Sequence, residues 1–582
     1  MVDQRDSPHR SSSISTRFAP RPTRTWVPFT AFLACTLLGV IDIASALTRG
    51  ERSRLRELRR IVPGGVAHVS TAGTLVVGVL LVMLAHGLRR RKGRAHKLTL
   101  GLMLGSVVFN VLKGLDVEEA TVSLCLLFAL VWFRREFYAE PDPHGRKQAW
   151  ALGLLLIGTS YVLGVTFIAI RQDELVHPFS LGSASLQVLE GLVGVNGPLA
   201  FTPGRRGEAT ADLVADALLG LGALTGLTVT YLLLRPAEPV PHMSPDDEQR
   251  IRALLGRSGP TDSLGYFSLR RDKSVIWSPS GKACIAYRVV SGVMLASGDP
   301  LGDPEAWPQA IQQFLDLAMR HAWAVGVMGC GELAGEAWVR AGLTALEIGD
   351  EAIVDVAGFS LEGRAMRNVR QAVARVERAG YSVTIDRVCD LSGEAVAEVA
   401  TQAASWRRSG TERGFSMALG RFGDPWDPGC VVVRAWQNGQ LRGFLHFVPW
   451  GRDGLSLDLM RRDRSADNGI NELLIVKALQ SGPNLGIRQV SLNFAVFRAA
   501  LEQGDRLGAG PVLRAWRGTL LFASRWFQIE SLYRFNAKFR PVWEPRYLCF
   551  ASTGELPRVA VAALRAESFI VLPTFRRRVH AA

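Results

Sequence analysis

Long apolar segments crowd the N-terminal part of the chain and then give way to shorter, alternating patterns. The segments of span length are Val27–Leu47, Val66–Leu88, Leu98–Leu115, Glu118–Phe133, Trp150–Ile170 and Leu213–Leu234. A helix that crosses a bilayer needs about 20 mostly apolar residues, so the third and fourth segments are short and predict tilted or re-entrant helices. The pattern predicts an all-α transmembrane block of about six helices over 26–235, after a basic tail at 1–25.

Beyond a proline-rich linker at 236–245, the pattern changes to short β-rich runs and amphipathic helices. We expect strands at Ser274–Trp277, Ala283–Val290, Ala352–Asp355, Cys430–Ala435, Leu441–Val448 and Leu455–Met460. The expected helices are Ala306–Ala322, Glu362–Ala379, Glu394–Trp406 and Asn471–Gln480. Strands that alternate with helices predict an α/β domain over 246–570, followed by a basic tail at 571–582.

The expected helix at 362–379 separates its residues into two faces. One face carries Met366, Val369, Val373 and Val376, and the other carries Arg364, Arg367, Arg370, Arg375 and Arg378. The apolar face is typical of a helix that packs on a domain core. The arginine face is either an ordinary solvated surface or a surface that contacts the phosphates of a nucleic acid.

The charge of the chain favours anionic partners. The 68 Lys and Arg residues outnumber 53 acidic residues, for a net charge of +15. Such an excess suits anionic lipid or nucleic acid, although part of it reflects the basic cytoplasmic loops of membrane proteins. Basic loops at 89–97 and 134–147 fall on the cytoplasmic side if six spans precede a cytoplasmic C-terminal domain.

One loop disagrees with this orientation. Residues 49–60 carry six arginines on what should be the outer side, so either a basic surface helix lies there or the span count is off by one. The seven cysteines include no C-x-x-C pair and no neighbouring histidine cluster. This spacing favours neither a disulfide framework nor a zinc site, and it predicts a reduced, cytoplasmic soluble part.

The most chemistry-like stretch runs from Gly454 to Leu474. A strand with Ser456 and Asp458 leads into a polar loop that ends at Asp467-Asn468-Gly469, and a helix follows. A helix that begins after such a turn presents free N–H groups to an anion. With the hairpin before it, this order resembles the core of acyl-coenzyme-A-dependent N-acetyltransferases. Their Q-x-x-G-x-G/A loop is absent, so acetyl-coenzyme A is disfavoured as a donor.

Seven stretches of the C-terminal part together match one known family. They are Trp277–Ala283, Ala296–Pro304, Gly349–Asp355, Phe359–Arg364, Glu412–Met417, Ser456–Arg461 and Ser531–Tyr547. In order and density, these stretches resemble the C-terminal synthase domain of the bacterial phosphatidylglycerol lysyltransferases, the multiple peptide resistance factor family. The resemblance covers roughly 246–570 and implies two tandem acyltransferase-like (GNAT-like) lobes.

The resemblance also implies an activity. An aminoacyl group, typically lysyl, passes from the 3′ end of aminoacyl-tRNA to the glycerol hydroxyl of phosphatidylglycerol in the plasma membrane. The cationic lipid product weakens attack by cationic antimicrobial peptides. The resemblance implies no cofactor and no metal, and it leaves a homo-oligomer open. Because the sequence shows no fused lysyl-tRNA synthetase, we expect charged tRNA to come from elsewhere.

The family resemblance assigns the site residues. The Asp and Arg of its D-L-M-R motif correspond to Asp458 and Arg461, which could hold a substrate ammonium and a phosphate or carbonyl. Candidate substrate-binding residues are Arg364, Arg367, Arg370, Glu412, His446, Asn468, Glu472, Asn493, Arg534, Lys538, Trp543 and Arg546. His446 is the weaker candidate for a base and is expected to be a packed strand residue. Trp543 and Phe539 could equally belong to a hydrophobic core.

Two departures from the family limit the transfer of its properties. Longer members carry about fourteen spans with a lipid flippase, so lipid flipping is in doubt for a block of about six. Where many relatives have Met-Asp, this chain reads Ile470-Asn-Glu, so the amino acid transferred could differ. Two alternatives remain: aminoacyl transfer to a peptidoglycan precursor or another lipid, and a non-catalytic membrane protein that binds tRNA or lipid.

Overall fold

The computed structural model divides between Ala237 and Glu238 into two compact units. It describes residues 26–47, 65–114, 117–139, 143–195, 197–234, 238–257, 262–407, 414–496 and 529–570. The basic tails and the arginine-rich residues 49–60 therefore lie outside the described residues, as does Glu412.

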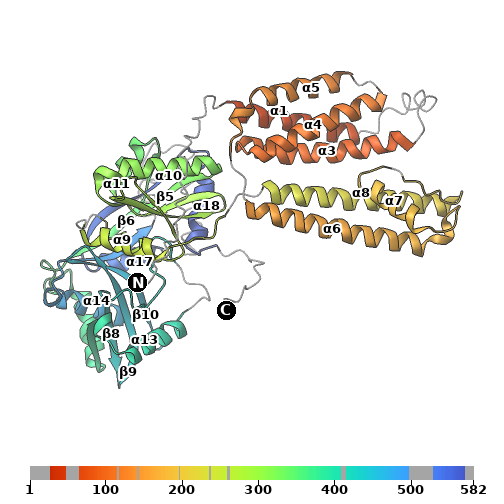
Figure 1. Ribbon diagram of the computed structural model, residues 1–582. Coiled ribbons are helices and arrows are strands. Elements are labelled where there is room, and N and C mark those ends of the chain that lie inside the picture. The colour runs from red at the N-terminus through yellow and green to blue at the C-terminus, as the bar shows by residue number, and fades with distance from the viewer. Residues whose placement is uncertain are drawn as a thin grey trace, which may run out of the picture. The chain divides into compact units, whose positions relative to one another are not determined.

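The N-terminal unit consists of helices (Figure 1). They are α1 (Val27–Leu47), α3 (Gly65–Arg89), α4 (Gly93–Gly114), α5 (Val117–Trp132), α6 (Pro143–Ile170), α7 (Leu181–Leu192) and α8 (Arg205–Leu234). A first core, which includes Leu81 and Leu84, joins α1, α3, α4 and α5. A second core, which includes Val188 and Leu218, joins α6, α7 and α8. Each of the six predicted spans coincides with one of these helices.

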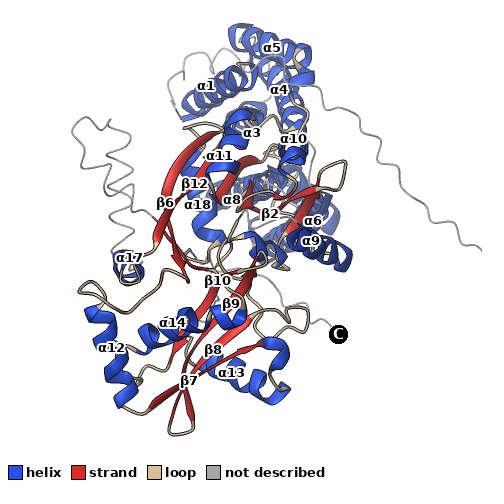
Figure 2. Cartoon of the chain, turned by 90° about the vertical axis from the view of Figure 1, so that its left-hand side faces the viewer, coloured by secondary structure: helices blue, strands red, loops and turns tan. Residues whose placement is uncertain are grey.

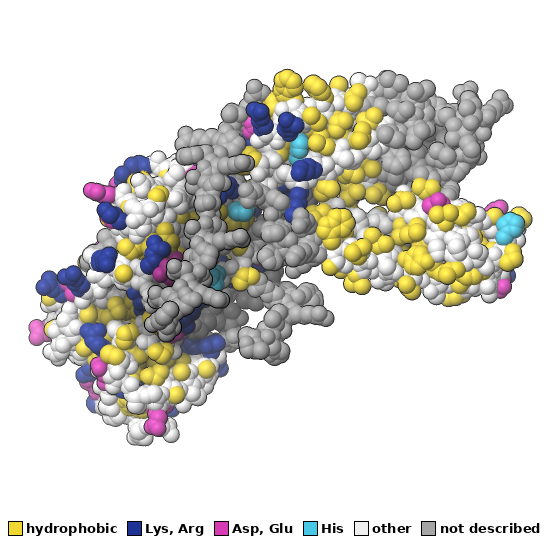
Figure 3. All heavy atoms as spheres, viewed as in Figure 1, with side chains coloured by type: hydrophobic (Ala, Val, Ile, Leu, Met, Phe, Trp, Pro, Cys, Tyr) yellow, Lys and Arg dark blue, Asp and Glu magenta, His cyan; other side chains and the backbone are white. Residues whose placement is uncertain are grey.

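The outer surfaces of these helices are strongly apolar. Within the described residues, α1, α6 and α8 contain segments long and apolar enough to cross a membrane. Large side chains such as Leu154, Leu155 and Leu163 on α6 are exposed, and Figure 3 shows hydrophobic side chains gathered along α6 and α8. Water disfavours an apolar surface of this extent, whereas lipid does not. The prediction of a helical membrane unit is confirmed, and the number of spans stays a prediction.

The C-terminal unit is built on one 12-stranded sheet with strand order β1-β2-β3-β5-β12-β6-β11-β10-β9-β8-β7, and β4 pairs with β2. The strands are β1 (Ser274–Trp277), β2 (Ala283–Val290), β3 (Val293–Ser297), β4 (Leu301–Gly302), β5 (Ala324–Cys330), β6 (Thr344–Asp355), β7 (Tyr381–Arg387), β8 (Val431–Gln437), β9 (Gln440–Trp450), β10 (Gly454–Arg462), β11 (Gln489–Val496) and β12 (Val542–Phe550). The helices are α9 (Pro245–Arg257), α10 (Trp307–His321), α11 (Glu332–Arg340), α12 (Arg367–Arg378), α13 (Gly393–Ser405), α14 (Ile470–Ser481), α17 (Ile529–Ala537) and α18 (Leu556–Ala566).

The order of elements repeats once along the sheet. In the first lobe, the antiparallel pair β2–β3 leads through α10 to β5, which lies parallel to β3. In the second lobe, the antiparallel pair β9–β10 leads through α14 to β11, which lies parallel to β10. The predicted α/β domain with two tandem acyltransferase-like lobes is confirmed.

The two lobes exchange their last strands. After β5, α11 leads to β6, which pairs with β11 of the second lobe. After β11, α17 precedes β12, which pairs with β5 of the first lobe. Because β6 and β12 also pair with each other, both half-sheets join into one continuous sheet.

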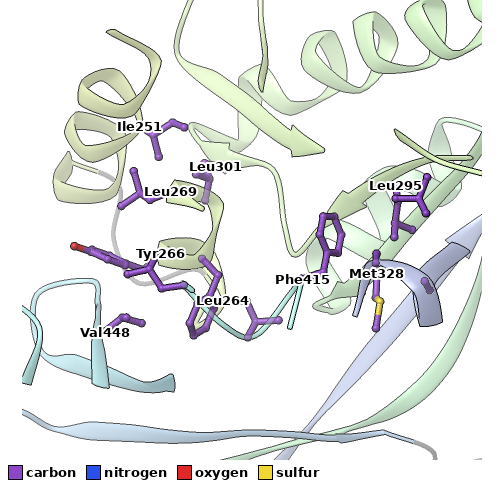
Figure 4. Packing of buried hydrophobic residues seen from close by; sticks show 14 of the residues in the cluster. Ile251, Leu264, Tyr266, Leu269, Leu295, Leu301, Met328, Phe415 and Val448 are labelled. Carbon is purple, nitrogen blue, oxygen red and sulfur yellow. The ribbon is translucent and has the colours of Figure 1, made fainter. Parts of the chain in front are cut away.

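Successive side chains of the strands in the second lobe point to opposite faces of the sheet, and each face packs into a different core. Val369 and Val373 of α12 pack with Phe447 of β9 on the side that α14 covers. Val399 of α13 and Phe444 of β9 belong to the other core. Figure 2 shows α12 and α14 to the left of β7–β10 and α13 to the right of them in that view. The core on the α13 side extends into the first lobe, where Leu295 lies with Leu264 and Phe415 (Figure 4).

The predicted strands and helices of this unit are close to the observed ones, with two informative differences. The helix predicted at 362–379 begins only at Arg367, so Arg364 lies before it. The predicted strands did not include β3, β5, β7, β11 and β12, and of these β12 is one of the two strands exchanged between the lobes. Buried runs such as Val293–Ser297 show no apolar and polar alternation, which is why periodicity did not reveal them.

The basic loops predict how the membrane unit is oriented. Reporter fusions after residues 140 and 240 should give cytoplasmic signals and a fusion after residue 190 an external one, because positive loops stay on the cytoplasmic side. Reporter activity, together with accessibility to a membrane-impermeant label, measures on which side of the membrane each fusion lies. An external signal at 240 would contradict the orientation.

Candidate active site

The two parallel strands of the second lobe separate where their polar residues begin. β10 pairs with β11 only from Gly454 to Ser456, and the register of β10 with β9 shifts between Leu457 and Leu459. The pairing of β11 with β6 also shifts, between Ser491 and Phe494. Asp458 is the extra residue of the β10 bulge, a feature that redirects a side chain and ends regular pairing.

Asp458 and His446 form a buried pair at this bulge. Oδ2 of Asp458 lies 2.7 Å from Nδ1 of His446, and their side chains are 0% and 1% exposed. The other carboxylate oxygen accepts the backbone N–H of Leu419 at 2.7 Å. Both carboxylate oxygens are therefore engaged inside the domain. The expectation that Asp458 holds a substrate ammonium stays a prediction.

Asn493 bridges the gap between the separating strands. Its side-chain amide donates to the carbonyl of Leu457 on β10 at 2.8 Å and to that of Met417 at 3.3 Å. The backbone of Asn493 is left-handed, with φ of 70°, which is uncommon for a residue other than glycine. This strained residue ties β11 to β10 and to the segment at 414–420, next to the Asp458 pair.

Arg461 lies on the same side of the sheet as His446. On β10, Leu459 is opposite His446 and Arg461 is opposite Phe444, and directly opposed residues of paired strands share a face. Arg461 donates to the carbonyl of Ala403 on α13 at 2.5 Å. Two residues of a strand span about 7 Å, so the backbone of Arg461 lies about 7 Å along the strand from the position opposite His446. The structure thus brings Asp458 and His446 together with Asn493 close by, and it places Arg461 on the same face of the sheet as His446.

The arginine stripe of α12 is exposed as predicted, but the turn beside it is not open. Arg364, Arg367 and Arg370 are exposed, and Arg370 also donates to the carbonyl of Leu361 at 2.5 Å. A Cβ at Gly469 would lie 3.1 Å from the carbonyl oxygen of Ala372, so α12 packs directly on the turn before α14.

The polar groups of this turn are also engaged. The carbonyl of Asn468 accepts from Arg375 at 3.0 Å, and the Asp467 N–H donates to the hydroxyl of Tyr381 at 3.2 Å. These contacts fix the turn against α12 and β7, whereas the side chain of Asn468 is exposed, so the expected anion loop stays a prediction.

The candidate residues of the motif Ser531–Tyr547 lie in two different places. Lys538 pairs with Glu472 of α14 at 2.7 Å, and Arg534 on α17 is exposed. Trp543 packs against Tyr533, with ring centroids 4.9 Å apart. With Phe539, Trp543 belongs to the core of the second lobe, as the packing alternative anticipated.

Arg546 lies elsewhere, in a buried ion network between the lobes. Its guanidinium donates to Asp262 at 2.8 Å, to Ser263 at 2.9 Å and to Glu351. The side chain is 5% exposed, and burial by itself would lower its pKa, but the carboxylates of Glu351 and Asp262 outweigh burial and hold the pKa well above the usual range. Arg546 was expected to contact substrate; its guanidinium instead stabilises the junction of β6 and β12.

A separate surface pocket contains none of the predicted site residues. It has a volume of about 370 Å³ and is lined by Glu332, Gly335, Glu336, Val339, Arg340, Ala345 and Tyr547. Its walls come from α11, β6 and β12, so it belongs to the first lobe and the exchanged strand. The site geometry points instead to the separated ends of β10 and β11.

Comparison with known families gives two matches. Residues 252–550 match the model "Phosphatidylglycerol lysyltransferase, C-terminal", which is more than half of the 582 residues. Residues 23–192 match the model "Transmembrane region of lysyl-tRNA synthetase". The two matches fall on the two ends of the chain in the order of the membrane unit and the α/β unit.

Several proteins are similar over most of the chain. "Lysylphosphatidylglycerol biosynthesis bifunctional protein LysX" of Mycobacterium tuberculosis is 52% identical over 515 residues, covering 86% of this chain and 43% of that protein. The protein of the same name from Mycolicibacterium gilvum is 39% identical over 573 residues, covering 96% of this chain and 51% of that protein. The chain thus spans about half the length of the curated relatives it matches.

Two solved structures are similar to the C-terminal unit. The structure titled "The structure of L-PGS from Bacillus licheniformis" is 23% identical, covers 57% of this chain and 99% of that one, and has a TM-score of 0.49. A C-terminal domain of a putative lysylphosphatidylglycerol synthetase from Agrobacterium fabrum is 24% identical, covers 55% of this chain and 96% of that one, and has a TM-score of 0.47.

The buried network around Arg546 predicts a pH-dependent stability. Asp299 accepts the Gly331 N–H at 2.7 Å, and burial, followed by the nearby carboxylate of Asp262, raises the pKa of Asp299 from 3.8 to about 8. Since the folded state holds this proton and the unfolded state releases it, the carboxyl lowers the stability as the pH rises from about 4 to 8.

Replacing Asp299 with Asn, which needs no proton, should therefore raise the free energy of unfolding. The gain should increase by up to about 1.4 kcal/mol per pH unit within that window. Urea unfolding of the full chain in detergent, followed by tryptophan fluorescence at pH 5, 6, 7 and 8, measures it. Asp246→Asn, at an exposed position, should show no such trend. A gain that is the same at every pH would contradict the buried, protonated state of Asp299.

Proposed function

We propose that this chain, which belongs to the phosphatidylglycerol lysyltransferase family, transfers a lysyl group from lysyl-tRNA to the glycerol hydroxyl of phosphatidylglycerol. The observation that carries the proposal is the family match over 252–550, which includes the Asp458 and Arg461 pair at the separated strands. The names of the mycobacterial relatives refer to lysylphosphatidylglycerol biosynthesis, which agrees with this assignment.

The proposed reaction requires mainly that the protein position its two substrates and stabilise the charge that develops. Both the tRNA-linked substrate and the lipid product are esters of the same amino acid, so the transfer is close to balanced in free energy. The enzyme then has to align the lipid hydroxyl with the ester carbonyl and stabilise the developing oxyanion. Arg461 is a permanently charged donor on the face that also carries His446, which suits the oxyanion or a lipid phosphate.

A direct transfer fits the residues better than a covalent enzyme intermediate. Within the described residues, His446 is bonded to Asp458 and not to a serine or cysteine side chain. A covalent route would require such a nucleophile within hydrogen-bond reach of the base. We infer that the lipid hydroxyl itself attacks the ester.

The membrane unit and the arginine stripe suit the two substrates. A helical membrane unit in the same chain keeps the α/β unit at the bilayer, where the lipid is, and basic loops favour anionic lipid. The exposed Arg364 and Arg367 are placed to contact tRNA phosphates. We propose that the α/β unit faces the cytoplasm and that the product protects the cell from cationic antimicrobial peptides. A homo-oligomer and the identity of the amino acid stay predictions.

The experiment that tests the function is transfer of label from lysyl-tRNA to lipid by the full chain in vesicles that contain phosphatidylglycerol. Labelled lysyl-phosphatidylglycerol should appear, and Arg461→Gln should lower its rate about 10²–10³-fold, as expected for one lost charge-assisted contact. Arg462→Gln is the matched control, because this neighbour lies on the opposite face of β10 and bonds to Ala466. No labelled lipid from the wild-type chain would reject the function, and full activity of Arg461→Gln would reject the site.

The arginine stripe gives a prediction about tRNA. The double variant Arg364→Gln/Arg367→Gln should raise the apparent KM for lysyl-tRNA and flatten its dependence on salt, by about 0.7–0.9 in log–log slope per lost phosphate contact. The control Arg320→Gln/Arg488→Gln removes the same charge from exposed positions on other elements. Equal slopes for the two double variants would make the stripe an ordinary solvated surface.

A further inference from the structure

One nitrogen of the His446–Asp458 pair is buried without a hydrogen-bond partner. Nε2 of His446 has none among the described residues, and neither does the hydroxyl of Ser456, two residues before Asp458 on β10. Ser456 is opposite Val448 and therefore faces the same side of the sheet as His446. A buried polar atom that stays unsatisfied costs about 1–3 kcal/mol, so folding alone does not favour this arrangement.

The contacts of Asp458 determine which nitrogen of His446 carries the proton. Its carboxylate accepts the Leu419 N–H through one oxygen and faces Nδ1 of His446 with the other. Because a carboxylate can only accept, Nδ1 must be the donor of that bond. In the neutral ring the lone pair is then on Nε2, the same nitrogen that lacks a partner. A substrate hydroxyl that donates to Nε2 would supply the missing hydrogen bond.

We propose that His446 is the general base of the transfer and that Asp458 is its positioning residue. The inference rests on the proposed function. Nε2 removes the proton from the glycerol hydroxyl as its oxygen bonds to the ester carbonyl carbon of lysyl-tRNA. When the intermediate collapses, the bond to the ribose oxygen breaks, and Nε2 returns the proton to that oxygen. The base is regenerated, and one ester is exchanged for another with no further reactant.

The surroundings of His446 suit this role. The ring of Phe422 lies edge-on to the imidazole, with centroids 5.1 Å apart, and Phe422 is itself only half-buried. The ring of Phe422 thus places apolar surface directly against the imidazole. We assign the oxyanion to Arg461, which lies on the same face of the sheet as His446 and carries a positive charge.

The first test removes the base and keeps its bond to Asp458. In His446→Asn, the side-chain amide can still donate to Asp458 in place of Nδ1, but no lone pair remains at the position of Nε2. The single-turnover rate of lysyl transfer by the full chain in phosphatidylglycerol vesicles should fall about 10²–10⁴-fold, with the affinity for lysyl-tRNA unchanged. Asp458→Asn should cause a comparable loss, because its amide would force the proton of His446 onto Nε2. His242→Asn, an exposed control, should retain full activity.

The second test distinguishes proton transfer from packing. In His446→Ala, added imidazole should restore part of the rate, and substituted imidazoles of similar size should restore more as their basicity increases. Rescue that does not depend on basicity, or wild-type transfer by His446→Asn, would overturn the base assignment while leaving the lipid product and the proposed function in place. If the wild-type chain makes no lysyl lipid at all, the proposed function and this inference fall together.

Discussion

The exchange of β6 and β12 between the lobes is the constraint on which the rest of the C-terminal unit depends. Each lobe contributes its last strand to the sheet of the other, so neither half-sheet is complete alone. The exchange brings Arg546 of β12 beside Glu351 of β6, and these charges can be buried only because they are paired. It also determines where the sheet opens. β11 stays paired with β6 while β10 stays paired with β9, so the two parallel strands diverge beyond Ser456.

The opening between β10 and β11 gives the site its chemistry. A bulge turns Asp458 toward His446, and the strained Asn493 ties the diverging strands together, so the polar groups are held by the backbone of a rigid sheet. Such preorganisation matters for an exchange of esters, because little driving force is available and the barrier is mainly one of alignment and charge. The membrane unit suits the proposed reaction, because the proposed acceptor is a lipid of the bilayer.

Length and periodicity revealed some elements and missed others. The apolar segments were recognised by their length, and the arginine stripe of α12 was recognised because Val369 and Val373 share one helix face. The fully buried β3 and β5 have no such pattern. The position of Arg546 could not be inferred either, because a strand exchange is a long-range pairing that leaves no local signal. The pairing of Asp458 with His446 was not predicted for a related reason: His446 is twelve residues away and meets Asp458 only through the β9–β10 register.

The protonation of His446 is the property that connects this fold to the proposed chemistry, and it can be observed without turnover. Nitrogen NMR of the full chain labelled with ¹⁵N-histidine, with His446→Asn to assign the signal, distinguishes a protonated ring nitrogen from one with a free lone pair. For the neutral ring, the structure predicts the proton on Nδ1, facing Asp458, and a free lone pair on Nε2. A neutral ring with its proton on Nε2 would mean that Asp458 does not orient the ring as a base, and would contradict the account.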